Sequence, residues 1–112
     1  METAKLVNDE GLICLAAFVA PQAANRELAA ELIGRDRFLV VHCAAPLAHC
    51  QATDSTGLYA EAAERDITGI PGVDFEYEVP TDADLVLPTH QIDYEESVNR
   101  ILALLRSRGL LR

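Results

Sequence analysis

The sequence predicts an α/β domain with a short, mostly parallel sheet of about three strands and flanking helices. Three apolar runs support the sheet, because continuous apolar runs are typical of strands that are covered on both faces of a parallel sheet. Segments with apolar residues at helical spacing alternate with these runs. Since strands that alternate with helices are typical of layered α/β domains, we expect helices on the faces of the sheet.

The first half of the chain predicts two strand-helix units. The run GLICLAAFVAP, Gly11–Pro21, is the first strand, and NRELAAELIG, Asn25–Gly34, is a helix that ends at glycine. The run RFLVVHCAAP, Arg37–Pro46, is the second strand, and a short helix follows over Pro46–Gln51. Both strands are expected to be buried.

The second half predicts a third strand and a long final helix. The run DLVL, Asp84–Leu87, follows the polar stretch PTDAD and is a short strand. From Tyr94 onward, YEESVNRILALLRSRG has acidic residues early and arginines late, which complements the helix dipole. The apolar residues expected on one face of this helix are Val98, Ile101, Leu102 and Leu105.

Two features indicate that the predicted fold is part of a larger one. The start, METAKLVNDEG, has a helical pattern that leads directly into the first strand. Three strands also form a small sheet for a parallel architecture with both faces covered. We therefore expect the chain to represent the second half of a larger fold, with open strand edges that favour self-association.

Length and composition predict a single soluble domain over residues 1–112. No stretch reaches the roughly 20 apolar residues of a membrane span, and the N-terminus lacks a signal-peptide pattern, so we expect a cytoplasmic protein without membrane contact. The net charge of −9 argues against nucleic-acid binding, because that binding requires a basic surface.

The cysteines and histidines are candidates for metal binding. Cys14, Cys43 and Cys50 lie in apolar sequence, which predicts buried, reduced thiols. The pairs His42-Cys43 and His49-Cys50 contain the ligand types that zinc prefers. Neighbours in a strand point to opposite faces, so His42 and Cys43 are poorly placed to share an ion. We expect no metal site.

Other polar residues are weaker candidates. His90, in the loop PTHQID, is expected at the surface. Glu76 and Glu78 form a pair in DFEYEVP, and paired acids can serve acid–base chemistry when their pKa values differ. Nothing in the sequence indicates burial, so a solvated loop is the preferred interpretation.

Arg26 lies at the start of a helix, just beyond a predicted strand. Open α/β sheets bind ligands at this edge. Its guanidinium suits a phosphate or sulfate, and the alternative is a surface ion pair with Glu27 or Glu31.

The segment Asp54–Pro80 has the layout of a substrate lid. A short amphipathic stretch is followed by glycines, prolines and aromatic residues, and the segment has seven acids against one base, a net charge of −6. The 112 residues contain no GxxxxGK[ST], GxGxxG or GxSxG motif. The backbone cradle that commonly holds nucleotide phosphates is therefore missing from them.

The order of these pieces resembles the C-terminal portion of adenylylsulfate (APS) kinases. The matching runs are EGLICLAAFVAPQAANR, RFLVVHCAAPLAHCQATDSTGLY, ITGIPGVDFEYEVP, ADLVL and ESVNRILALL, and the most specific pieces are APL..C, D..GLY and PGVDF.YE.P. The resemblance implies part of a three-layer P-loop-kinase-like fold and an enzyme, usually dimeric, that phosphorylates the 3′-hydroxyl of APS with magnesium-ATP to make PAPS. It also places a strand absent from this chain between Gly11–Phe18 and Arg37–Cys43, which must otherwise pair directly or accept a strand from another chain.

The resemblance implies a remnant substrate site and no catalytic or metal-binding residue in this chain. Val19-Ala20-Pro21 stands where the family usually has Ile-Ser-Pro, beside the APS pocket, and Arg26 keeps one of two arginines. Other matches lie in the lid-like segment. The substrate-binding residues implied in this way are Val19, Pro21, Arg26, Leu58, Gly72 and Val73.

Departures from the family pattern predict that this chain is inactive by itself and holds no cofactor. The family typically carries Pro-Lys before GLY and two lysines after it, whereas this chain has Ser55-Thr56 and Ala60-Glu61. The expected ligand is APS or PAPS, and the expected assembly is a homo-oligomer or a complex with a sulfate-activation enzyme. Two alternatives remain: a regulatory or scaffold domain that docks on a full-length APS kinase or ATP sulfurylase, and a fragment of an active kinase whose P-loop half lies upstream or on another chain.

Overall fold

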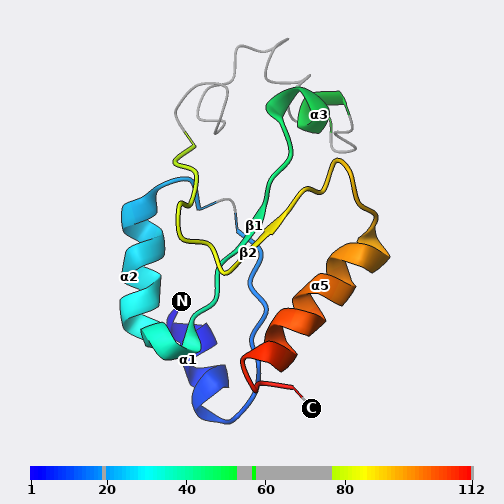
Figure 1. Ribbon diagram of the computed structural model, residues 1–112. Coiled ribbons are helices and arrows are strands. Elements are labelled where there is room, and N and C mark those ends of the chain that lie inside the picture. Colours follow the sequence, from blue (N-terminus) through cyan, green and yellow to red (C-terminus); the bar gives the residue numbers. More distant parts are fainter. Residues whose placement is uncertain (19, 53–56, 58–76, 112) are drawn as a thin grey trace.

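The computed structural model describes residues 1–18, 20–52, 57 and 77–111 (Figure 1). The α-helices, strands and 3-10 helix described follow one another in the order α1 Glu2–Asp9, α2 Ala23–Ile33, η1 Arg35–Arg37, β1 Val41–Cys43, α3 Leu47–Ala52, β2 Leu85–Leu87 and α5 Tyr94–Ser107. Both predicted long helices and the short helix after the second predicted strand are confirmed, with ends that differ by a few residues.

The fold is α/β, with a short parallel sheet between helices. β1 and β2 pair in parallel, with Val41 opposite Leu85 and Cys43 opposite Leu87. Helix α2 lies on one side of this sheet and α5 lies on the other (Figure 1). The predicted strands at Arg37–Pro46 and Asp84–Leu87 are thus confirmed, although β1 covers only Val41–Cys43 of its apolar run and Arg37 belongs to η1.

The packed core consists of a few apolar side chains from α2, β2 and α5. Leu87 of β2 is the most deeply buried side chain in the described part of the chain, with 2 % of its surface exposed. Ala29, Ala30 and Ile33 on one face of α2 and Leu105 of α5 complete the buried set. β2 packs against α5, and α2 packs against α1.

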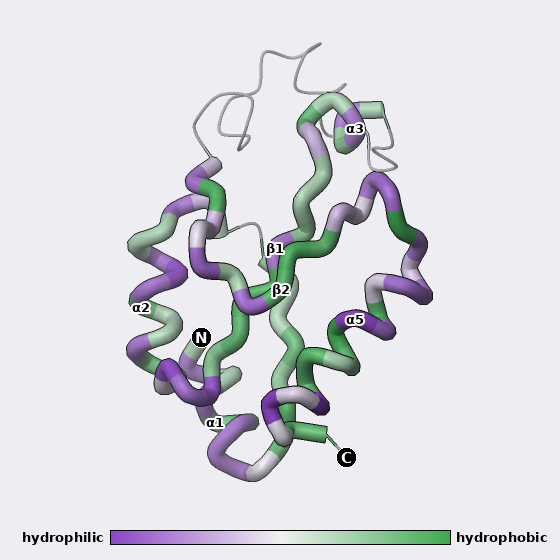
Figure 2. The backbone as a smooth tube through the Cα atoms, viewed as in Figure 1, coloured by the Kyte–Doolittle hydropathy of each residue, from purple (hydrophilic) through white to green (hydrophobic). Residues whose placement is uncertain are grey.

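The prediction of a buried first strand is wrong. Residues Gly11–Phe18 are all exposed and lie in no strand, although hydrophobic residues run along this part of the tube in Figure 2. A strand needs a neighbour for its backbone hydrogen bonds, and no backbone group from Ile13 to Phe18 bonds to another described residue. The expected direct pairing with Arg37–Cys43 does not occur among the described strands.

The prediction of buried thiols is also wrong, because none of the three cysteines is fully buried. Cys14 and Cys43 are exposed, and Cys50 is half-buried. Cys14 is exposed because its segment is not covered by a sheet. All three are free thiols, as expected.

Salt bridges and hydrogen bonds tie α1 and α5 to the rest of the fold. Asp9, near the end of α1, accepts from Lys5 at 2.8 Å and from Arg37 of η1 at 3.1 Å. The hydrogen bond from Lys5, followed by that from Arg37, holds the pKa of Asp9 below its usual value. Asp84 accepts from the Val40 backbone N–H at 2.7 Å and from Arg108 at 3.0 Å, which links the start of β2 to the end of α5.

Helix α5 begins at a side-chain cap. Asp93 accepts a hydrogen bond from the Glu96 backbone N–H at 2.9 Å, and the first turn is acidic, as the dipole favours. The predicted apolar face is only partly covered, since Leu105 is buried while Val98 is exposed. Among the described residues, no helix is long and apolar enough to cross a membrane.

We expect Asp93→Ala to lower the free energy of unfolding by about 1 kcal/mol, because the Glu96 N–H loses its acceptor at the helix start. Urea unfolding followed by circular dichroism measures this change. Glu95→Ala is the matched control, because it removes an acidic side chain from the same turn without removing the cap. Equal losses in both variants would contradict a specific capping role.

Candidate functional site

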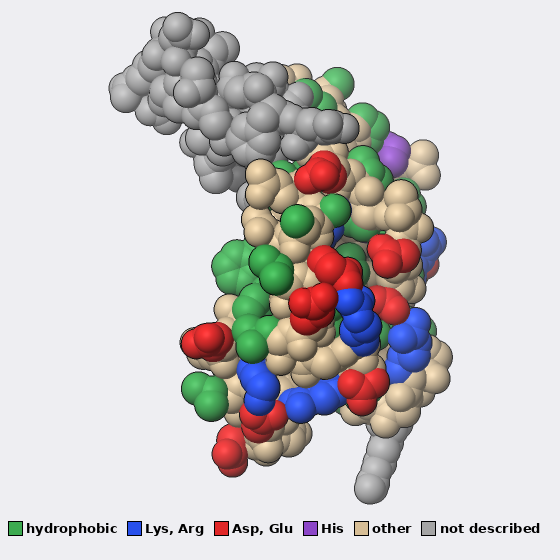
Figure 3. Space-filling view, turned by 90° about the vertical axis from the view of Figure 1, so that its left-hand side faces the viewer, with side chains coloured by type: hydrophobic (Ala, Val, Ile, Leu, Met, Phe, Trp, Pro, Cys, Tyr) green, Lys and Arg blue, Asp and Glu red, His purple; other side chains and the backbone are tan. Residues whose placement is uncertain are grey.

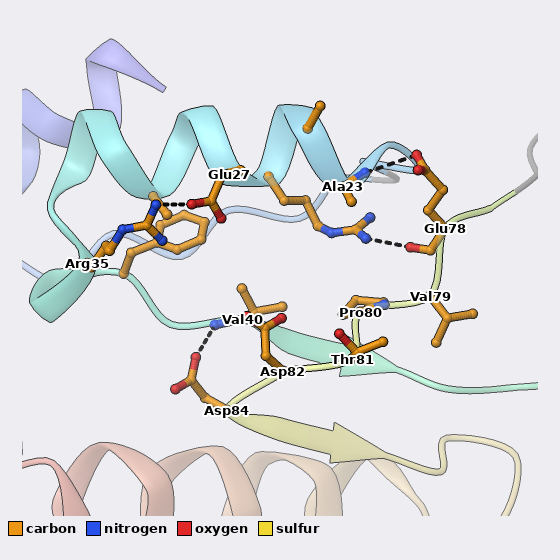
Figure 4. Close-up of a pocket in the computed structure, with 14 residues that line it drawn as sticks. Ala23, Glu27, Arg35, Val40, Glu78, Val79, Pro80, Thr81, Asp82 and Asp84 are labelled. Carbon is orange, nitrogen blue, oxygen red and sulfur yellow. Dashed lines mark hydrogen bonds and ion pairs between the residues drawn. The ribbon is translucent and has the colours of Figure 1, made fainter.

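A pocket of about 690 Å³ lies between α2 and the segment 78–84 (Figure 4). Ala23, Glu27 and Ala30 contribute from α2, while Arg35 and Val40 come from the chain that follows it. Its remaining lining residues include Arg26, Phe38, Glu78, Val79, Pro80, Thr81, Asp82 and Asp84. The pocket is therefore built from two segments that are about 50 residues apart in the sequence, with both acidic and basic groups in its wall.

Arg26 joins these two segments. Its Nη1 donates to the Ala20 carbonyl and its Nη2 donates to the Glu78 carbonyl, each at 2.5 Å. The guanidinium also lies over the Tyr77 ring, 5.9 Å from the ring centroid. Arg26 is half-buried, so these contacts fix a cation at the start of α2 with little freedom to move.

The alternative of an Arg26 ion pair with Glu27 or Glu31 is wrong, because Arg35 takes both carboxylates. Arg35 pairs with Glu27, as Figure 4 shows, and lies 3.7 Å from Glu31. Among the described residues, Arg26 has no carboxylate partner, since both of its acceptors are backbone carbonyls. Within the described part of the chain, the positive charge of Arg26 is therefore not paired with a carboxylate.

Glu78 strengthens the same junction from the other side. Its backbone N–H donates to the Pro21 carbonyl at 2.8 Å. Its carboxylate accepts from the Ala23 backbone N–H at 3.1 Å, at the first residue of α2 (Figure 4). An acid at this end of a helix is favourable, because the amides there are unpaired and carry partial positive charge. Although Glu78 is exposed, its carboxylate bonds to the first residue of α2 and its backbone bonds to Pro21, so it is not simply a solvated side chain in a loop.

The backbone before Pro21 has a rare conformation. Ala20 has a φ of 39°, in the left-handed region that side chains other than those of Gly, Asn and Asp seldom adopt. The Arg26 hydrogen bond to its carbonyl stabilises this turn. The turn brings Pro21 beside Glu78 and sets the position from which α2 begins.

Two of the six predicted site residues, Pro21 and Arg26, are described, and both belong to this junction. The other four, Val19, Leu58, Gly72 and Val73, lie outside the described residues, as does most of the lid-like segment 54–80. The role of Glu78 as a helix cap was missed, because it pairs with a residue 55 positions away and no local pattern reports such a contact.

The histidines make ring contacts. His42 stacks on Tyr77 with ring centroids 6.1 Å apart, and His49 meets His90 edge to face at 6.0 Å. His90 is exposed, as predicted. Within the described residues, no group of three or more His, Cys, Asp or Glu side chains is placed to hold a metal ion.

The face on the α2 side is strongly mixed in charge. Figure 3 shows acidic and basic side chains side by side across it, with hydrophobic side chains gathered along one border. Single charges on such a surface are largely screened by solvent and salt.

Comparison with known proteins identifies the family of this chain. Residues 1–88 match the sequence profile of the adenylylsulphate kinase family. An adenylyl-sulfate kinase of Bacteroides thetaiotaomicron is 43% identical over 103 residues, which cover 92% of this chain and 51% of that protein. A bifunctional enzyme CysN/CysC of Rhodopirellula baltica is 40% identical over 109 residues, which cover 97% of this chain and 17% of that enzyme.

A solved structure agrees with this similarity. The Mycobacterium tuberculosis APS kinase CysC, in complex with AMPPNP and APS, superposes with a TM-score of 0.86 and 32% identity. The superposition covers 94% of this chain and 61% of that kinase. The chain thus spans about half the length of the single-function kinases that it matches, with the same arrangement of its elements. The protein belongs to the adenylylsulphate kinase family, and it corresponds to part of the length of the kinases that it matches.

Proposed function

We propose that this chain keeps a remnant site for the adenylylsulfate class of nucleotide, APS or PAPS, and performs no phosphoryl transfer by itself. The observation that carries the proposal is Arg26, a half-buried cation held beside Pro21 without a carboxylate partner among the described residues. A guanidinium held in this way attracts a sulfate or phosphate group, because such groups supply the missing opposite charge. The similar kinase CysC was solved with APS bound, which supports this ligand class.

The proposed absence of catalysis is supported by what phosphoryl transfer requires. The reaction depends on cationic groups and a metal ion that position and neutralise the transferred phosphate. The 112 residues contain no GxxxxGK[ST] motif, and the segment 54–80 has a net charge of −6. Loss of one such cationic group commonly lowers the rate about a thousandfold. We propose that the active reaction needs residues that these 112 do not supply, either upstream or on another chain.

Isothermal titration calorimetry tests the binding half of the proposal. We expect heat on titration of APS into the purified chain, and much weaker heat with AMP, which lacks the sulfate. A coupled assay with magnesium-ATP and APS is expected to show no PAPS above the rate without protein. Absence of heat with APS would overturn the binding proposal, and turnover by the purified chain would overturn the proposed inactivity.

A second candidate function is that of a regulatory or scaffold domain that docks on a full-length APS kinase or on an ATP sulfurylase. The bifunctional relative supports it, because the region that matches this chain forms only 17% of that enzyme, so most of that polypeptide lies outside the match. This candidate predicts a stable complex that is unaffected by APS. Analytical ultracentrifugation with and without APS separates it from the first candidate.

A further inference from the structure

The ring of Tyr77 joins two side chains that lie on different elements. His42, the central residue of β1, stacks on this ring with centroids 6.1 Å apart and planes inclined by 19°. The Arg26 guanidinium, on α2, lies over the same ring at 5.9 Å from its centroid. All three residues are half-buried. The ring therefore connects the sheet to the cation of the proposed APS site.

The ring and the two carbonyl groups hold different parts of Arg26. Nη1 and Nη2 donate to the Ala20 and Glu78 carbonyls, and such bonds lie in the plane of the guanidinium, where all of its donors are. An aromatic ring instead attracts the face of the group and uses no donor. Within the described part of the chain, the other N–H groups of Arg26 therefore stay available to an anion.

The contact between Arg26 and the ring depends on the charge of the guanidinium. A cation within about 6 Å of a ring centroid is attracted to the electron-rich face, and the attraction grows where water is partly excluded. The distance of 5.9 Å and the half-burial of Arg26 meet both conditions. The hydroxyl of Tyr77 makes no hydrogen bond to another described residue, so the ring itself accounts for the contact.

We infer that Tyr77 is a positioning residue of the proposed APS site. The face of its ring holds the Arg26 guanidinium in one orientation before the ligand arrives, so that less side-chain freedom is lost when a sulfate or phosphate group binds. Tyr77 acts through Arg26 rather than by contact with the ligand. The inference rests on the proposed function for its ligand, and it adds a residue outside those implied by the sequence.

Calorimetric titration of APS into three variants tests the role of the ring. Tyr77→Phe keeps the aromatic face, and we expect its dissociation constant to stay within about twofold of that of the parent chain. Tyr77→Leu removes the face, and we expect APS to bind about fivefold more weakly. Tyr94→Leu is the matched control, because Tyr94 on α5 is 92% exposed and lies outside the site. Its affinity for APS is expected to equal that of the parent chain.

A fluorinated ring at position 77 separates this role from simple packing. Trifluorophenylalanine, introduced in place of Tyr77 by suppression of a stop codon, keeps nearly the shape of phenylalanine, while its fluorine atoms withdraw electrons from the face of the ring. A packing contact tolerates that change, whereas the attraction of a cation is weakened. We expect this chain to melt close to the temperature of Tyr77→Phe and to bind APS about threefold more weakly than Tyr77→Phe does.

Nitrogen NMR of the chain without APS gives an independent measurement. A held guanidinium rotates slowly about its Nε–Cζ bond, and we expect exchange between the two Nη signals of Arg26 to be about threefold faster with the fluorinated ring than in Tyr77→Phe. Equal exchange or equal APS binding in these two chains would overturn the inference, as would equal weakening by Tyr77→Leu and Tyr94→Leu. Absence of APS heat in the parent chain would overturn the proposed function, and the NMR comparison would then decide by itself whether Tyr77 holds Arg26.

Discussion

Replacement of Leu87 by alanine is expected to lower the free energy of unfolding by about 2–5 kcal/mol, the largest effect of any single truncation in the described core. Leu87 has 2% of its surface exposed, and it lies on the strand between α2 and α5. Its loss removes apolar contacts and leaves a cavity that the surrounding side chains fill only partly.

Val86→Ala is the matched control for this prediction. Val86 is the preceding residue of the same strand, and its side chain is 51% exposed, so its truncation is expected to cost well below half as much. Chemical unfolding of the parent chain and both variants, followed by circular dichroism, gives the comparison. Similar losses at the two positions would show that β2 is not packed as described.

Arg26→Ala is expected to produce the second-largest effect and to act on both stability and binding. The substitution removes two charge-assisted hydrogen bonds, to Ala20 and Glu78, and we expect a loss of about 2–3 kcal/mol. The left-handed turn at Ala20 loses its support at the same time. On the proposed function, the heat of APS binding is also lost.

Two control variants separate these roles. Arg35→Ala removes another arginine of the same pocket, but its ion pairs with Glu27 and Glu31 are exposed, so the expected cost is within about 0.5 kcal/mol and APS still binds. Arg26→Lys keeps the positive charge but lacks the planar guanidinium that donates to both carbonyls. Compared with Arg26→Ala, it should restore part of the APS binding and little of the stability. Unchanged APS heat in folded Arg26→Ala would remove Arg26 from the ligand site and leave it a purely structural contact.

Local patterns predicted the helices well. The acidic start and basic end of α5, and the glycine after α2, are signals within a single turn, and both helices form there. Gly34 follows α2 with a φ of 103°, a conformation that suits glycine. The strands β1 and β2 were also predicted, because their apolar runs are short, bounded by polar residues and able to pair with each other.

The same reasoning failed at residues 11–18. Their apolar run is indistinguishable from that of a buried strand, but burial requires a neighbouring strand that these 112 residues do not place there in the described structure. The cysteine prediction failed for the same reason at Cys14. An apolar pattern reports what a segment can bury, and the surrounding chain decides whether it is buried.

The sequence alone determined the α/β class, the helices and the family, because these depend on local spacing and on motifs that survive in order. Only the tertiary structure decided the state of the site. In it, Arg26 donates to two backbone carbonyls instead of pairing with a carboxylate, and the Glu78 carboxylate accepts from the first residue of α2. The apolar run Leu12–Phe18 is exposed to solvent. The contacts of Arg26 and Ala23 with Glu78 join segments about 50 residues apart, and the exposure of Leu12–Phe18 reflects the lack of a neighbouring strand among the described residues. A local sequence pattern reports neither of these.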